Sequence, residues 1–175
     1  MRSRVDVKIA VSMVLIIALL MPTTAMAGLS SKKVAYIGGT TKNIVFPSAK
    51  KEVIGRFTDD NLALRFIPDK KNLSAHIIQY NQIIDIEYGQ KAGRRVGAAV
   101  ATAVLLTPIG LLMLFSKKRK HYVTIGFMDD NGFEQVSIFE LGKDIVRTTL
   151  PVLKARSGKE IIYQDEEAKK HAGVN

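Results

Sequence analysis

The three histidines are the first residues to test for chemistry, because imidazole binds metals and transfers protons near neutral pH. His76, His121 and His171 lie far apart in the sequence, and none has a cysteine or a carboxylate at the spacing of a metal-binding motif. The chain has no cysteine, so thiol nucleophiles, thiolate ligands and disulfides are excluded. We therefore expect the histidines to be structural or surface residues.

Two Asp-Asp-Asn runs, at residues 59–61 and 129–131, have the oxygen ligands that calcium prefers. Hairpin turns select the same residue types for their backbone tolerance, and we expect turns at both places. The run "YIGGT" lacks the lysine and the following helix of a phosphate-binding loop. No Ser-His-Asp set or carboxylate pair can be assigned from spacing, so we expect no enzyme, no cofactor and no metal.

A stretch of twenty uncharged residues, 96–115, interrupts the second half of the chain. As a helix it would be about 30 Å long, enough to reach across a bilayer. We expect a hydrophobic helical insertion over residues 94–117, flanked by the basic residues Arg94, Arg95, Lys117, Lys118, Arg119 and Lys120. The side chains expected to enter lipid are those of Val96, Val100, Val104, Leu105, Leu106, Pro108, Leu111, Leu112, Leu114 and Phe115.

Three arrangements of this insertion remain open. A single span would place the strands before and after it on opposite sides of a membrane. The run "TPIG" at residues 107–110 favours a break, and a re-entrant hairpin would return both ends to one face. A helix buried inside a soluble domain is the third arrangement. We favour the hairpin, because it lets strands from both halves share one sheet.

The first 27 residues have the pattern of a secretory signal peptide. Arg2, Arg4 and Lys8 precede an apolar run, residues 9–21, and "AMA" ends at Ala27 as a small-residue cleavage site. An uncleaved anchor helix is the alternative. We expect an exported protein of the bacterial envelope.

The formal net charge of +10 suits either nucleic acid or an anionic membrane. An exported chain seldom meets nucleic acid, and the densest basic cluster, "KKRK" at residues 117–120, adjoins the apolar stretch. Basic residues in that position are attracted to negatively charged lipid. We expect anionic membrane lipid to be a partner and nucleic acid not to be one.

Period-2 alternation predicts a β-hairpin over residues 53–68, two short strands within 77–88 and a second hairpin over 121–141. Wider apolar spacing predicts an amphipathic helix over 141–155, kinked or shortened by Pro151 and ended by Gly158. A short strand within residues 159–164 and a frayed polar tail over 164–175 complete the chain. The expected core residues are Phe57, Leu64, Phe66, Val123, Ile125, Phe127, Leu150 and Leu153.

Three runs carry a family resemblance: "GRFTDDNLALRF" at 55–66, "IIQYNQIIDIEYG" at 77–89, and "HYVTIGFMDDNG" at 121–132 followed by "VSIFEL". Their order resembles bacterial PH-like and GRAM-like domains. The resemblance implies a mainly β, PH-like barrel over residues 28–163, with a C-terminal amphipathic helix closing one end. The phosphoinositide-binding basic loop of eukaryotic relatives has no counterpart in the acidic turn at residues 58–61, so we do not transfer that site.

These patterns favour a membrane-associated, non-enzymatic PH-like module. It would attach to lipid through the insertion and its basic flanks and present a surface to an unknown protein partner. The first alternative is a soluble carrier of an apolar ligand. The second is two β segments joined by one transmembrane helix, and an enzyme is the weakest alternative.

Overall fold

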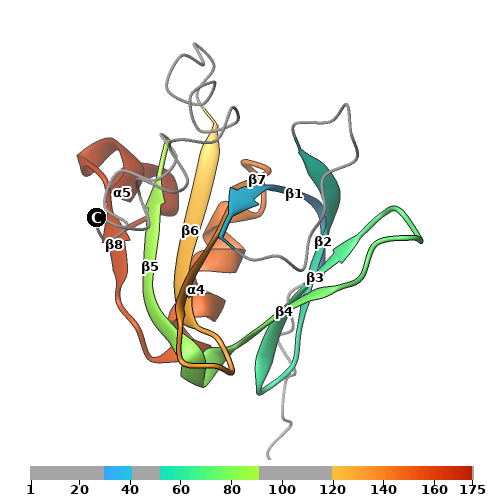
Figure 1. Cartoon of the computed structure of the whole chain (residues 1–175). Helices are drawn as coiled ribbons and strands as arrows, with labels where there is room; N and C mark the ends of the chain where they lie inside the picture. The colour runs from blue at the N-terminus through green and yellow to red at the C-terminus, as the bar shows by residue number, and fades with distance from the viewer. Residues whose placement is uncertain (1–29, 41–51, 91–119, 175) are drawn as a thin grey trace, which may run out of the picture.

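The computed structural model of the chain describes residues 30–40, 52–90 and 120–174. These residues form one eight-stranded sheet and two short α-helices (Figure 1), so the expected mainly β fold is confirmed. The strands are β1 (Ser30–Gly39), β2 (Val53–Asp59), β3 (Ala63–Pro68), β4 (His76–Gln79), β5 (Ile83–Gly89), β6 (His121–Met128), β7 (Glu134–Leu141) and β8 (Ile161–Tyr163). The helices are the 3-10 turn η1 (Tyr80–Gln82), α4 (Val146–Ser157) and α5 (Glu166–Ala172).

The sheet joins two antiparallel meanders, β1 to β4 and β5 to β7. The strand order is β4-β3-β2-β1-β7-β6-β5-β8, and β1 pairs with both β2 and β7. Strand β5 pairs with β6 along its length, from Ile83 opposite Phe127 to Gly89 opposite Tyr122. Strands from before and after residues 91–119 therefore belong to one sheet.

The sheet bends back on itself, because a very short connection joins two strands that are far apart in its order. Six strand-to-strand steps separate β4 from β5, which in a flat sheet would place them roughly 29 Å apart. Only η1 connects them, and the four peptide steps from Gln79 to Ile83 reach at most about 14 Å. Figure 1 shows β4 and β5 converging where η1 joins them. Within the described ranges no pairing links β4 to β5, so the sheet is curved and open.

Both expected hairpins are present, and their turn carboxylates are occupied by backbone donors. Asp60 Oδ1 accepts hydrogen bonds from the N–H groups of Leu62 and Ala63, at 2.8 and 2.9 Å. Asp129 Oδ1 accepts from the N–H groups of Asn131 and Phe133, both at 2.9 Å. The described residues contain no group of three or more side chains placed to hold a metal. The turn interpretation is thus supported over calcium binding.

The core lies inside the curve of the sheet and is built around aromatic rings. Phe57 and Phe139 meet edge to face with ring centroids 4.8 Å apart, and Phe66 lies 5.5 Å from Phe139. All of the core residues expected from the sequence are buried: Phe57, Leu64, Phe66, Val123, Ile125, Phe127, Leu150 and Leu153. Period-2 alternation therefore identified the inward face of β2, β3 and β6 correctly.

Helix α4 packs against this core, but it begins later than expected. Leu141, the predicted first helical residue, belongs to β7, where it pairs with His121. The buried residues of α4 recur at the three-and-four spacing of one helical face: Val146, Thr149, Leu150 and Leu153. The helix continues through Pro151, and Gly158, at φ 69°, ends it as expected.

The C-terminal segment differs from the expected frayed tail over 164–175, because residues 166–172 form helix α5. Asp165 caps it by accepting a hydrogen bond from the Ala168 N–H at 2.8 Å, and Ala168 is fully buried. The polar composition of this segment gave no sign of the helix, which is stabilised by one buried residue, Ala168, and by the cap at Asp165. The short strand expected before it is β8, which pairs with β5 in parallel.

The other expectations about membrane segments fall outside the described residues. They concern the signal segment 1–27, the insertion 94–117 and all the side chains expected to enter lipid. Of the basic flanking residues, the structure describes only Lys120. In the part of the chain that the structure describes, no helix is long and apolar enough to cross a membrane.

Replacing Leu153 by alanine should destabilise the domain, because its fully buried side chain fixes α4 to the core. We expect Leu153→Ala to lower the free energy of unfolding by about 2–5 kcal/mol, measured by denaturant titration. Thr148→Ala, an exposed change on the same helix, should alter it by less than about 0.5 kcal/mol. Equal stability of Leu153→Ala and the unmodified chain would contradict this placement of α4.

Candidate functional site

The two ends of the connection over residues 91–119 meet at one end of the sheet. Gly89 at the end of β5 pairs with Tyr122 near the start of β6, so the chain leaves and returns between neighbouring strands. Lys120 is the one predicted flanking residue that the structure describes, and its Nζ lies 2.7 Å from Glu140 Oε2. The other flanking residues, Arg94, Arg95, Lys117, Lys118 and Arg119, lie outside the described residues.

Two histidines that are distant in sequence meet at this same end. His121 begins β6 and is buried, and its Nδ1 shares a 2.7 Å hydrogen bond with the Tyr88 hydroxyl. The ring of His171, from the last turn of α5, lies 5.3 Å from the His121 ring, centroid to centroid. Sequence spacing gave no signal of this pair, because docking of α5 creates it.

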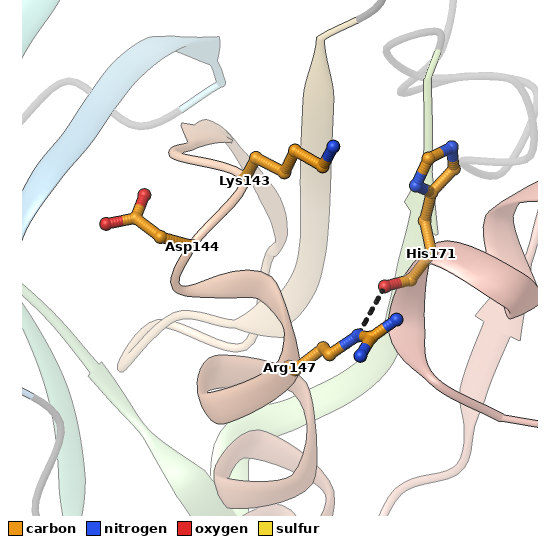
Figure 2. Close-up of a pocket in the computed structure, with 4 residues that line it drawn as sticks. All are labelled: Lys143, Asp144, Arg147 and His171. Atoms are coloured by element: carbon orange, nitrogen blue, oxygen red, sulfur yellow. Dashed lines mark hydrogen bonds between the residues drawn. The ribbon is translucent and has the colours of Figure 1, made fainter.

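A pocket of about 640 Å³ adjoins the histidine pair and is lined by Lys143, Asp144, Arg147 and His171. Lys143 and Asp144 lie in the connection from β7 to α4, and Arg147 lies in the first turn of α4. Arg147 Nε donates a hydrogen bond to the backbone oxygen of His171 at 3.3 Å, which links α4 to α5 (Figure 2). These residues were not singled out from the sequence, where they look like ordinary surface charges.

Basic side chains lie close to His121 beside this pocket. The pKa of His121 is lowered first by burial and then by the positive charges of His171 and Lys143. The nearby carboxylates are Asp144, which points away from Arg147 and His171 in Figure 2, and Glu167, whose Oε1 lies 3.9 Å from His171 Nε2. Basic groups from the β7–α4 connection, α4 and α5 therefore meet at this end of the domain, together with the two carboxylates.

A smaller pocket, of about 210 Å³, lies between α4, β8 and α5. It is lined by Leu150, Pro151, Lys154, Glu160, Ile161, Tyr163, Ala172 and Val174. Its volume is below the roughly 300 Å³ at which small-molecule sites usually begin. This pocket gives little support to a soluble carrier of an apolar ligand.

The third histidine, His76, belongs to the core. Its ring lies 5.8 Å from that of Phe127 and 6.4 Å from that of Phe139, and its Nε2 is 2.9 Å from Ser137 Oγ. Burial lowers the pKa of His76 to about 4. His76 is thus a neutral structural residue, as expected from the sequence.

Comparison with known proteins adds no relative to this description. A scan against models of protein families finds no match for the chain, and a search of curated proteins finds none. Arguments about function therefore rest on the residues and geometry described above.

Burial of His76 should make the fold less stable in acid. Between pH 6.5 and pH 4 the unfolded chain binds a proton at His76 that the folded chain excludes. The stability that the neutral, buried imidazole contributes is therefore fully present above pH 6.5 and is lost as the pH falls toward 4. We expect the free energy of unfolding to decrease by about 2 kcal/mol from pH 7 to pH 5, measured by denaturant titration at each pH. His121 acts in the same direction.

The matched variant is His76→Gln, which does not titrate in this range. Its stability at pH 7 should be lower, because the contacts of the imidazole are lost, but the slope between pH 7 and pH 5 should be shallower. An unchanged slope would show that the pH dependence does not come from His76.

Proposed function

We propose that this protein is an exported, non-enzymatic PH-like module attached to the bacterial envelope membrane. The apolar insertion over residues 94–117 enters lipid, its basic flanks contact anionic headgroups, and the sheet domain presents a surface to a protein partner. The pairing of β5 with β6 is the single observation that carries this proposal.

The pairing supports an insertion whose two ends lie on one face of the membrane. Directly opposed residues of antiparallel strands lie only about 5 Å apart, and Gly89 is opposed to Tyr122. A single span would hold these residues on opposite sides of roughly 30 Å of hydrocarbon. The two arrangements are incompatible for strands that share a sheet, so the pairing favours a re-entrant or interfacial hairpin over a single span. The buried helix is also compatible with the pairing, and the membrane-extraction experiment below distinguishes it from the hairpin.

Chain length limits how far the basic flanks can lie from this end of the sheet. Arg94 follows Gly89 by five residues and Lys117 precedes His121 by four, which limits their distances from the sheet to about 18 Å and 14 Å. The pocket lined by Lys143, Asp144, Arg147 and His171 is at this end as well. Such a concentration of basic residues beside an apolar segment is what an anionic membrane surface attracts.

The PH-like assignment is supported by the sharp curvature of the sheet and by α4. The helix follows the β5–β7 meander and buries one face against the core. The chain departs from the expected pattern in its open sheet and in β8 and α5, which follow the helix.

Membrane attachment should survive salt and require detergent for release. We expect washing of membranes with concentrated salt to leave the protein in the pellet, because burial of apolar surface is not screened by ions. Immunoblotting of pellet and supernatant measures this. Release by salt alone would contradict insertion.

Charged substitutions give the matched test of which segment attaches. Leu105→Arg with Leu112→Arg should convert the protein to a salt-extractable form, because each buried arginine costs about 2.5–3.5 kcal/mol in hydrocarbon. Leu62→Arg with Phe133→Arg is the control, since those turn residues are 72% and 67% exposed. It should stay membrane-bound. Equal retention of both double variants would mean that another segment anchors the chain.

Single cysteines should report which side each end of the insertion occupies. The chain has no cysteine, so Gly93→Cys or Ser116→Cys introduces a unique thiol. We expect a membrane-impermeant maleimide applied to sealed vesicles to label both positions from the same side. Labelling from opposite sides would exclude the hairpin and would be incompatible with the β5–β6 pairing.

A further inference from the structure

The pocket at the junction of α4, α5 and the sheet has the features of an anion site. It is about 640 Å³ in volume, and Lys143, Arg147 and His171 reach it from the β7–α4 connection, α4 and α5. In Figure 2 the Lys143 side chain extends toward the side of His171, whereas Asp144 points the other way. Three nitrogen donors of basic side chains thus border one space.

We infer that this pocket binds a phosphate group, held by Lys143, Arg147 and His171. Arginine presents a planar set of N–H donors suited to two phosphate oxygens, lysine adds a mobile positive charge, and imidazole donates a further hydrogen bond. The guanidinium is already oriented by the bond from its Nε to the His171 backbone oxygen. Only its Nε donates in that bond, so its terminal nitrogens are the donors that would contact phosphate.

The electrostatics of the neighbouring residues support the inference. Burial is the main cause that lowers the pKa of His121, and His171 and Lys143 lower it further, which reflects how close these basic groups lie. Asp144 and Glu167 oppose an anion, but each has an interaction of its own. The first turn of α4 has no acidic residue. No carboxylate within that turn therefore offsets the positive end of the helix dipole, which favours a bound anion.

The source of the phosphate follows from the position of the pocket, and this step rests on the proposed function. The pocket lies at the end of the sheet from which residues 91–119 depart. If that connection enters a membrane, the pocket lies at the depth of the headgroups. An anionic phospholipid headgroup is then the nearest phosphate, and a soluble phosphate compound is the other source of the same chemistry.

Calorimetric titration of the full-length chain in non-ionic detergent and phosphate-free buffer tests the inference. The probes are inorganic phosphate, short-chain phosphatidylglycerol and short-chain phosphatidylcholine as the zwitterionic comparison. We expect Lys143→Gln and Arg147→Gln each to weaken binding by about tenfold, as for the loss of one charge-assisted contact. Lys159→Gln, which removes an exposed charge just beyond α4, should leave it unchanged.

Lys143→Gln guards against a folding artefact, because Lys143 has no hydrogen bond to α5 among the contacts of the described residues, whereas Arg147 has one. Tighter binding of phosphatidylglycerol than of inorganic phosphate would identify a lipid headgroup, and equal binding would identify a soluble phosphate compound. Absence of binding, or equal binding by the unmodified chain and both pocket variants, would overturn the inference.

The salt-wash assay distinguishes failure of this inference from failure of the proposed function. Pocket variants that lose phosphate binding but stay in the membrane pellet would support both. A chain that binds phosphate but is washed off by salt would retain the pocket and refute lipid insertion. An unmodified chain that stays in the pellet but binds no phosphate would refute the phosphate site and leave the proposed function standing.

Discussion

The pairing of β5 with β6 is the constraint from which the other features follow. It joins residues 83–89 to residues 121–128 across a connection that contains the twenty uncharged residues 96–115. The hydrogen bonds of this ladder, with Gly89 opposite Tyr122, fix where the connection starts and where it ends. The same ladder places Tyr88 beside His121, and their 2.7 Å hydrogen bond lies next to the site where α5 docks.

Curvature is the second consequence of chain connectivity. The three residues of η1 must carry the chain between strands that are six steps apart in the sheet, which a flat sheet does not permit. Bending encloses the aromatic cluster of Phe57, Phe66 and Phe139 and creates a concave face for α4. At the C-terminal end of α4, Arg156 pairs with Asp59, with Nε 3.6 Å from Oδ2, and holds the helix to the β2–β3 hairpin.

Charged side chains are distributed unequally along the domain, and the functional proposals assign a role to each end on that basis. The end opposite the β2–β3 and β6–β7 turns holds Lys143, Arg147 and His171, whereas the carboxylates of Asp60 and Asp129 are bonded within their own turns. The proposed insertion into lipid and the proposed binding of a phosphate group both use the end that holds Lys143, Arg147 and His171. The turn end carries the exposed apolar side chains Leu62 and Phe133, and in the proposed function it is the surface available to a protein partner.

Much of the fold could be predicted from the sequence, because strand alternation and turn residues are local signals. Phe57 and Phe66 on paired strands, the Asp129 turn and the stop at Gly158 each follow from spacing or backbone preference. Local signals gave the wrong start for α4, since pairing of Leu141 with His121 extends β7 into the predicted helix. They also missed α5, where burial of Ala168 and a cap at Asp165 outweigh a polar composition.

The candidate site lies at the other extreme. Composition and the apolar stretch by themselves determined that a basic, cysteine-free chain carries a lipid-compatible segment with basic flanks. Only the tertiary structure decided that His121 and His171, fifty positions apart, would lie with ring centroids 5.3 Å apart. It also decided that Lys143 and Arg147 would border the same pocket. The physical reason is that a binding site is a set of distances between residues remote in sequence, and those distances are set by strand register and helix docking, which no local pattern encodes.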